Sequence, residues 1–130
     1  MKLSLRLVAL VCAVYSCKSS TAPIADCWSA GVKQISIGVG TQPSFTWSSC
    51  AVSAVTVTES SIIKWSVASR DKDAIAPPVQ YGVKPPHADT EYVAPSALIM
   101  GHTYRLQLQG HPVGAAAGLT AVLADTAFTP

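Results

Sequence analysis

The chain has 130 residues, of which 49% are hydrophobic and 12% are charged, and its formal net charge is +2. Two of its nine basic side chains, Lys2 and Arg6, lie in an N-terminal segment of leader type, and the other seven (9 − 2 = 7) balance the seven acidic side chains. Because a nucleic-acid-binding surface needs clustered Lys and Arg side chains, this balance argues against a nucleic-acid partner.

The N-terminal segment has the layout of a secretory signal peptide. Lys2 and Arg6 give it a positive start, residues 7–14 are continuously apolar, and Ser16 is a small residue at the expected cleavage point. The apolar run is much shorter than the roughly 20 residues that span a bilayer. We therefore expect residues 1–16 to be a signal peptide and not a membrane span.

Val14-Tyr15-Ser16-Cys17 resembles the lipobox of bacterial lipoproteins. The resemblance implies that Cys17 is acylated, that residues 17–25 form a lipidated tether, and that the membrane is a partner through this anchor. Two or three acyl chains anchor durably because each buried CH₂ contributes about 0.8 kcal/mol. The protein would then lie in the bacterial cell envelope, on the periplasmic or outer face. The alternative is cleavage after Ala22, which would release a secreted protein without Cys17.

Two of the four cysteines belong to this leader, because Cys12 lies in the apolar run and Cys17 is the lipid acceptor. Cys27 and Cys50 remain (4 − 2 = 2), and an oxidising compartment favours a disulfide between them. Closing a loop of this length would stabilise the fold by about 3 kcal/mol. The competing roles, a metal site or a redox pair, lack the Cys-x-x-Cys spacing.

Residues 26–130 are enough for a single domain, and their β-branched and aromatic content favours strands. Five runs alternate with the two-residue period of a strand that has one buried face. Their expected buried residues are Ile35, Ile37 and Val39; Phe45 and Trp47; Val55 and Val57; Ile63, Trp65 and Val67; and Tyr104, Leu106 and Leu108. The pattern predicts an all-β fold, an antiparallel two-sheet sandwich or a barrel.

Three other segments are less regular. Residues 79–83 or 91–93 are expected to supply an edge strand, because the neighbouring prolines argue against a central position. Residues 114–124 are rich in alanine and fit either a short helix or a strand that begins to alternate at Leu119. We favour a final strand that ends near Phe128.

Two motifs resemble those of fibronectin type III modules. Pro43-Ser44-Phe45-Thr46-Trp47 is similar to their second strand, in which a tryptophan fills the core, and residues 98–106 are similar to the entry of their sixth strand. The resemblance implies an immunoglobulin-like sandwich with Trp47 in the core and a tyrosine corner at Tyr104. In such a corner the ring is buried while the hydroxyl bonds to backbone upstream, here near residues 98–100.

A second resemblance concerns the whole chain. A tryptophan strand, a Pro-Val-x-Tyr-Gly segment at 78–82 and a Gly-x-x-Tyr strand at 101–104 look like those of small bacterial lipoproteins. This resemblance implies no known activity. The expected organisation is a signal peptide (1–16), a lipidated tether (17–25) and one fibronectin type III-like sandwich (26–130).

The residue types that carry catalysis or bind metals form no known pattern. The three histidines are widely and irregularly spaced: His87, His102 and His111. A copper or zinc site that uses His87, Asp89 and one other histidine is therefore a weak alternative to separate surface histidines. Basic neighbours of Asp71 and Asp73 disfavour calcium, and there is neither a nucleophile elbow nor a phosphate-binding glycine loop. We expect no enzymatic activity, no cofactor and no metal.

Aromatic residues near loops are the candidates for binding. Tyr81 and Tyr92 flank a proline-rich loop, and we take them as an exposed platform that would stack on sugar rings. Trp65 is expected inside, because it alternates with Ile63 and Val67. The sequence thus predicts a non-catalytic structural or protein-interaction module, with an unknown envelope protein or glycan as its partner. The alternative is a carbohydrate-binding module that uses the loop aromatics.

The predicted membrane anchoring can be tested at the proposed acylation site. Cys17→Ala should abolish incorporation of a clickable fatty acid and release the protein from the membrane fraction, because the anchor depends on that thiol. Labelling of the variant equal to that of the parent would contradict lipidation at Cys17.

Overall fold

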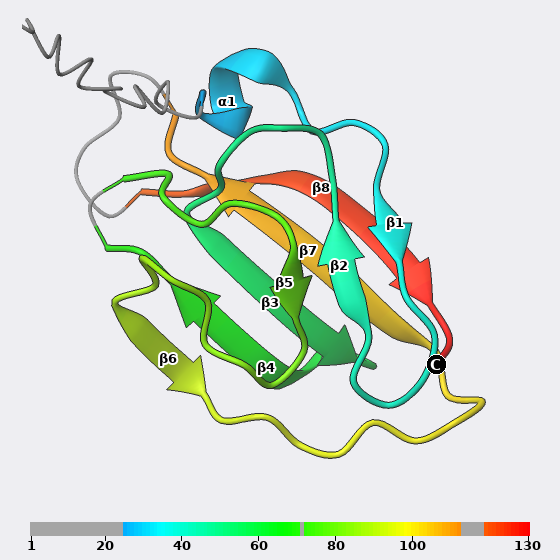
Figure 1. The fold of residues 1–130 in the computed structure, drawn as a ribbon. Helices are drawn as coiled ribbons and strands as arrows, with labels where there is room; N and C mark the ends of the chain where they lie inside the picture. Colours follow the sequence, from blue (N-terminus) through cyan, green and yellow to red (C-terminus); the bar gives the residue numbers. More distant parts are fainter. Residues whose placement is uncertain (1–24, 71, 113–118) are drawn as a thin grey trace, which may run out of the picture.

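The structure is a computed structural model, and it describes residues 25–70, 72–112 and 119–130. The predicted signal peptide, Cys17 and nearly all of the tether lie outside these residues. Within them the chain forms one short helix and eight strands (Figure 1). Their bounds are α1 Cys27–Ala30, β1 Ser36–Ile37, β2 Ser44–Thr46, β3 Ala54–Glu59, β4 Ile62–Ala68, β5 Val79–Gln80, β6 Thr90–Val93, β7 Tyr104–Gly110 and β8 Ala121–Phe128.

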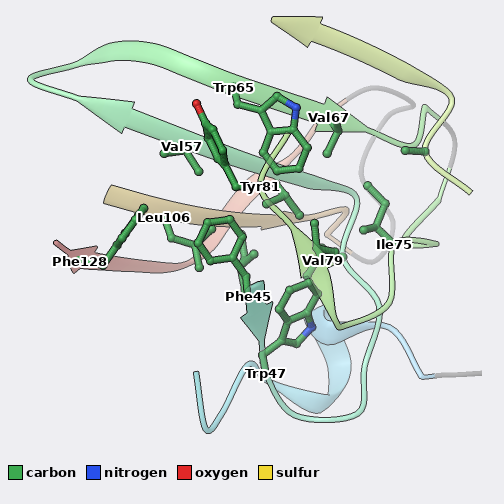
Figure 2. Close-up of a cluster of buried hydrophobic side chains, with 14 of the residues drawn as sticks. Phe45, Trp47, Val57, Trp65, Val67, Ile75, Val79, Tyr81, Leu106 and Phe128 are labelled. Carbon is green, nitrogen blue, oxygen red and sulfur yellow. The ribbon is translucent and has the colours of Figure 1, made fainter. Parts of the chain in front are cut away.

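The strands form two antiparallel sheets. The smaller has the order β1-β2-β5, and the five-stranded sheet has the order β6-β4-β3-β7-β8. In Figure 1 the smaller sheet lies across the larger one, and buried side chains from both fill the space between them (Figure 2). The predicted all-β antiparallel sandwich is confirmed, and it is compatible with an immunoglobulin-like or fibronectin type III-like fold.

The central strands show the predicted alternation. On β3, Val55 and Val57 are fully buried in the core, while Thr56 and Thr58 point to the other face of the sheet. β7 does the same, with Leu106 and its alternate neighbours in the core. Because both strands pair with each other in the middle of the sheet, they determine which side chains face the core and which face solvent.

Two predicted core residues are exposed instead. Val39 is 94% exposed, because β1 ends at Ile37 and the chain turns towards β2 before the alternation reaches Val39. Ile63 is 45% exposed, because the pairing of β3 with β4 shifts register after Val57 and sets Ile63 opposite Thr58. An extra residue at a β-bulge reverses the face on which the following side chains lie, so a strict alternation fails there.

The C-terminal segment is a strand, as favoured. β8 runs antiparallel to β7 and places Phe128 opposite Tyr104, with both rings in the core. The strand begins at Ala121, two residues after the expected start of the alternation at Leu119, which is 59% exposed. Of the segment 114–124, residues 114–118 lie outside the described part of the chain.

Both segments considered for an edge strand are edge strands. β5 lies at one edge of the smaller sheet, and β6 lies at one edge of the larger sheet, next to β4. Trp65 on β4 is fully buried, as expected, and its indole N–H donates to Glu91 Oε1 of β6 at 2.9 Å. Trp47 is also core, and its indole donates to the carbonyl of Cys50. Each buried indole thus has a partner for its polar N–H.

The predicted disulfide joins Cys27 to Cys50, with their Cα atoms 4.9 Å apart. Asp26 caps the short helix that contains Cys27, because its carboxylate accepts from the backbone N–H of Ser29 at 2.8 Å. A parallel bridge also pairs Asp26 with Ala51. The start of the domain is therefore fastened to the segment between β2 and β3 both covalently and by backbone hydrogen bonds.

The tyrosine corner is present at the start of β7. Tyr104 is 1% exposed, and its hydroxyl accepts a hydrogen bond from the backbone N–H of Ile99 at 2.8 Å. Its ring lies 5.8 Å from that of Phe128, centroid to centroid. Gly101, at φ 83°, supplies the left-handed turn that brings the chain back to the hydroxyl. The predicted partner region, residues 98–100, is confirmed.

Substitution of Tyr104 tests how much this corner contributes. Tyr104→Phe keeps the ring but leaves the Ile99 N–H without its acceptor, so the free energy of unfolding should fall by about 1 to 3 kcal/mol. Tyr104→Ala also opens a cavity and should cost roughly 3 to 5 kcal/mol. Chemical denaturation measures both, with Tyr92→Phe at an exposed tyrosine as the control that leaves stability unchanged. Two Tyr104 variants as stable as the control would contradict the corner.

Candidate binding surface

The outer face of the five-stranded sheet contains a hollow of about 730 Å³, which we call the polar hollow. Seven serine and threonine hydroxyls, two glutamine amides, two arginines and one histidine line it, together with Tyr92, Ile63 and Ala68. The lining comes mainly from β3, β4 and β7, the strands whose other face builds the core. The same alternation that buries Val55 and Leu106 therefore places a row of polar side chains on the outer face of the sheet.

Hydrogen bonds hold the floor of the hollow in place. Thr56 Oγ1 and Ser66 Oγ are 3.0 Å apart across β3 and β4, and Thr56 is only 6% exposed. Thr120 Oγ1 donates to Gln109 Oε1 at 3.0 Å. The bond to Thr120 uses the carbonyl oxygen of the Gln109 amide, so the amide nitrogen keeps two N–H donors for a ligand.

Arg105 and Gln107 are both positioned by Asp125 of β8. Arg105 Nε donates to Asp125 Oδ1 at 2.8 Å, and Gln107 Nε2 donates to Asp125 Oδ2 at 3.3 Å. The hydrogen bond from Arg105 holds the pKa of Asp125 below its usual value. This arrangement leaves the terminal guanidinium nitrogens of Arg105 and the carbonyl oxygen of Gln107 available to a ligand.

The other basic residues of the lining, Arg70 and His111, lie towards the opposite end of the strands. His111 is held from behind by Asp73, whose Oδ1 accepts from the His111 backbone N–H at 3.0 Å and lies 3.2 Å from Nδ1. The Asp73 side chain is only 4% exposed. The backbone N–H of Arg70 donates to Asp89 Oδ2 at 2.8 Å, which fixes the chain at the point where its side chain enters the hollow.

The two tyrosines taken as candidates lie in different environments. Tyr92 is 61% exposed on β6 and forms part of the lining of the polar hollow. Tyr81 is 2% exposed, its ring meets that of Trp65 edge to face at 5.3 Å, and its hydroxyl donates to the carbonyl of Ser96. Burial raises the pKa of Tyr81 to about 12. The expected exposure of Tyr81 is therefore wrong, and the structure does not combine the two rings into one platform.

The histidines have separate surroundings. His102 Nδ1 lies 2.7 Å from Glu59 Oε1, and this hydrogen bond, followed by that of Lys64, holds the pKa of Glu59 below its usual value. His87 lies in the loop between β5 and β6 with a φ of 66°. Among the residues that the structure describes, no three His, Cys, Asp or Glu side chains gather to hold a metal. Asp71, considered above for calcium, lies outside those residues.

The polar hollow was not predicted from the sequence, although the residue types at the outward strand positions indicate part of it. The outward positions of the central strands carry hydroxyl and amide side chains such as Thr56, Ser66 and Gln107. A solvated face usually carries Lys and Glu, which are the residues least often buried. The choice of uncharged polar groups at these positions could have marked the face, but the hollow also includes Arg70, Tyr92 and Thr120, which only the fold brings together.

Comparisons of the chain with protein-family models, with curated proteins and with solved structures found no match. In the described part of the chain, no helix is long and apolar enough to cross a membrane. The chemistry of the polar hollow is therefore the basis on which a function is assigned.

Proposed function

We propose that this protein is a non-catalytic binding module of the bacterial cell envelope, anchored through a lipid on Cys17, and that its polar hollow holds a segment of a glycan. The observation that carries the proposal is the lining of the hollow by hydroxyl and amide groups on three adjacent strands. The geometry favours the carbohydrate-binding alternative over a purely structural role, because the concave face lies opposite the core and is not needed to close the sandwich.

The lining suits a ligand that has many hydroxyl groups. Serine and threonine hydroxyls both donate and accept, and the glutamine amides add fixed donors and acceptors, so each can bond to a sugar hydroxyl in either sense. Binding sites combine a few placed polar groups of this kind with apolar surface. Here Tyr92 and Ile63 supply that surface within the lining.

The same lining favours binding without hydrolysis. Glycoside hydrolases use two carboxyl groups that flank the scissile bond. Among the described residues that line the hollow there is no Asp or Glu. Asp73 and Asp125 are bonded to His111 and Arg105, which line the hollow, so their role is to position those side chains.

The proposal is tested with the intact lipoprotein in detergent on an array of bacterial and plant polysaccharides. At least one polysaccharide should be retained, and Gln109→Ala or Tyr92→Ala should weaken that binding by about ten-fold, the effect of losing roughly 1.4 kcal/mol of contacts. Lys84→Ala is the matched control, because Lys84 lies in the loop after β5 and lines a separate pocket with Val79 and Gln80.

Two results would contradict the proposal. One is the absence of binding to every polysaccharide on the array by a protein that melts cooperatively. The other is an affinity for the polysaccharide that is the same in Gln109→Ala, Tyr92→Ala and the Lys84→Ala control. The ligand would then lie elsewhere on the surface.

A further inference from the structure

We infer that the glycan is acidic: a polysaccharide with carboxylates on its sugar rings, whose negative charges meet Arg105 and Arg70 at the two ends of the polar hollow. This inference rests on the proposed function and adds the chemical class of the ligand. The evidence for an acidic ligand is the sign and the spacing of the charged side chains on the outer face of the five-stranded sheet.

Every ionisable side chain lining the hollow in the described part of the chain, apart from Tyr92, is basic: Arg70, Arg105 and His111. Each of the three has a carboxylate partner outside the lining of the hollow. Asp125 bonds to Arg105 through Nε, the Asp73 side chain, 4% exposed, lies against His111, and Asp89 accepts from the backbone N–H of Arg70. Because the guanidinium fork matches a carboxylate, the terminal nitrogens of Arg105 suit a sugar carboxylate in geometry as well as in charge.

The two arginines lie far apart along the strands. Arg105 pairs with Thr58 at one end of β3, whereas Gln109 pairs with Ala54 at the other end, four residues further along β7. Ala54 also pairs with Ala68, and Arg70 follows two residues later. Six residues of strand span about 20 Å. One small anion cannot reach both cations, but a chain that carries a carboxylate on successive units can.

The floor between the arginines distinguishes an acidic sugar chain from an acidic peptide. It consists of side-chain hydroxyls and amides such as Thr56, Ser66 and Gln107 on the face of the sheet. An extended peptide gains affinity mainly by pairing its backbone with the edge of a sheet, where N–H and C=O groups are exposed. The backbone of β3 and β4 pairs within the sheet, which leaves the side chains of its face to recognise the ligand.

The test uses three polymers with the intact lipoprotein in detergent micelles: polygalacturonate, the same polymer with its carboxylates methyl-esterified, and polyglutamate. Calorimetry should show that polygalacturonate binds at least about ten-fold more tightly than either of the others, because only it has both the charges and the ring hydroxyls. Its affinity should fall as salt is raised, since the arginines are exposed to solvent.

Variants then test whether Arg105 and Arg70 are the residues that bind the carboxylates of the polymer. Arg105→Gln and Arg70→Gln should each weaken polygalacturonate binding by about ten-fold and reduce the salt dependence. Lys84→Gln removes a positive charge beside β5 and should leave both unchanged. Thermal melting of each variant shows that the fold is retained.

Each outcome separates the two proposals. Equal binding of the esterified and the free polymer would overturn the acidic class while leaving a glycan-binding function in place. Polyglutamate that binds as well as polygalacturonate would mean that charge alone is recognised, which contradicts a sugar ligand. If none of these polymers binds, the ligand is not an acidic polysaccharide. If no polysaccharide on the array binds either, the proposed glycan-binding function is overturned as well.

Discussion

The alternation of side chains on β3, β4 and β7 is the constraint on which both faces of this protein depend. Each of these strands points one set of side chains into the core and the next set to the outer face, so Val57 and Leu106 are buried while Thr56 and Gln107 line the hollow. A one-residue slip between these strands would exchange the two sets and lose the core and the polar surface together. The binding face is thus held in position by the packing behind it.

A disulfide and a tyrosine-corner hydrogen bond stabilise the sandwich away from this central packing. The disulfide between Cys27 and Cys50 fastens the helix at the start of the domain to the segment after β2. The tyrosine corner fixes the loop that leads into β7, where Ile99 donates to the buried Tyr104 hydroxyl. In Figure 1, α1 and the start of β7 lie towards opposite ends of the sandwich. β7, the strand that carries Arg105, begins at Tyr104, where the hydrogen bond from Ile99 holds the chain in place.

Features that depend on local pattern could be predicted from the sequence, and features that depend on pairing could not. The pair Cys27 and Cys50 and the Leu-x-x-Gly-x-x-Tyr motif are local signals, and both the disulfide and the corner are present. Ile63 was misplaced because a register shift between two strands leaves no mark in either strand alone. Tyr81 was misplaced because its neighbours, Trp65 and Ser96, come from distant segments of the chain. The lining of the hollow comes from several paired strands and the segments beside them, so its residues were visible in the sequence but their shared surface was not.

The most direct test of the account is to map where a glycan contacts the protein, by NMR titration of the isotopically labelled protein with short fragments of polygalacturonate and, separately, of dextran. The account predicts that the ligand that binds shifts the side-chain amide signals of Gln107 and Gln109 and the backbone signals of β3, β4 and β7, while β1, β2 and β5 remain unchanged. Shifts that concentrate on the smaller sheet, or that are absent from both glutamine amides, would contradict the claim that the outer face of the five-stranded sheet is the binding surface.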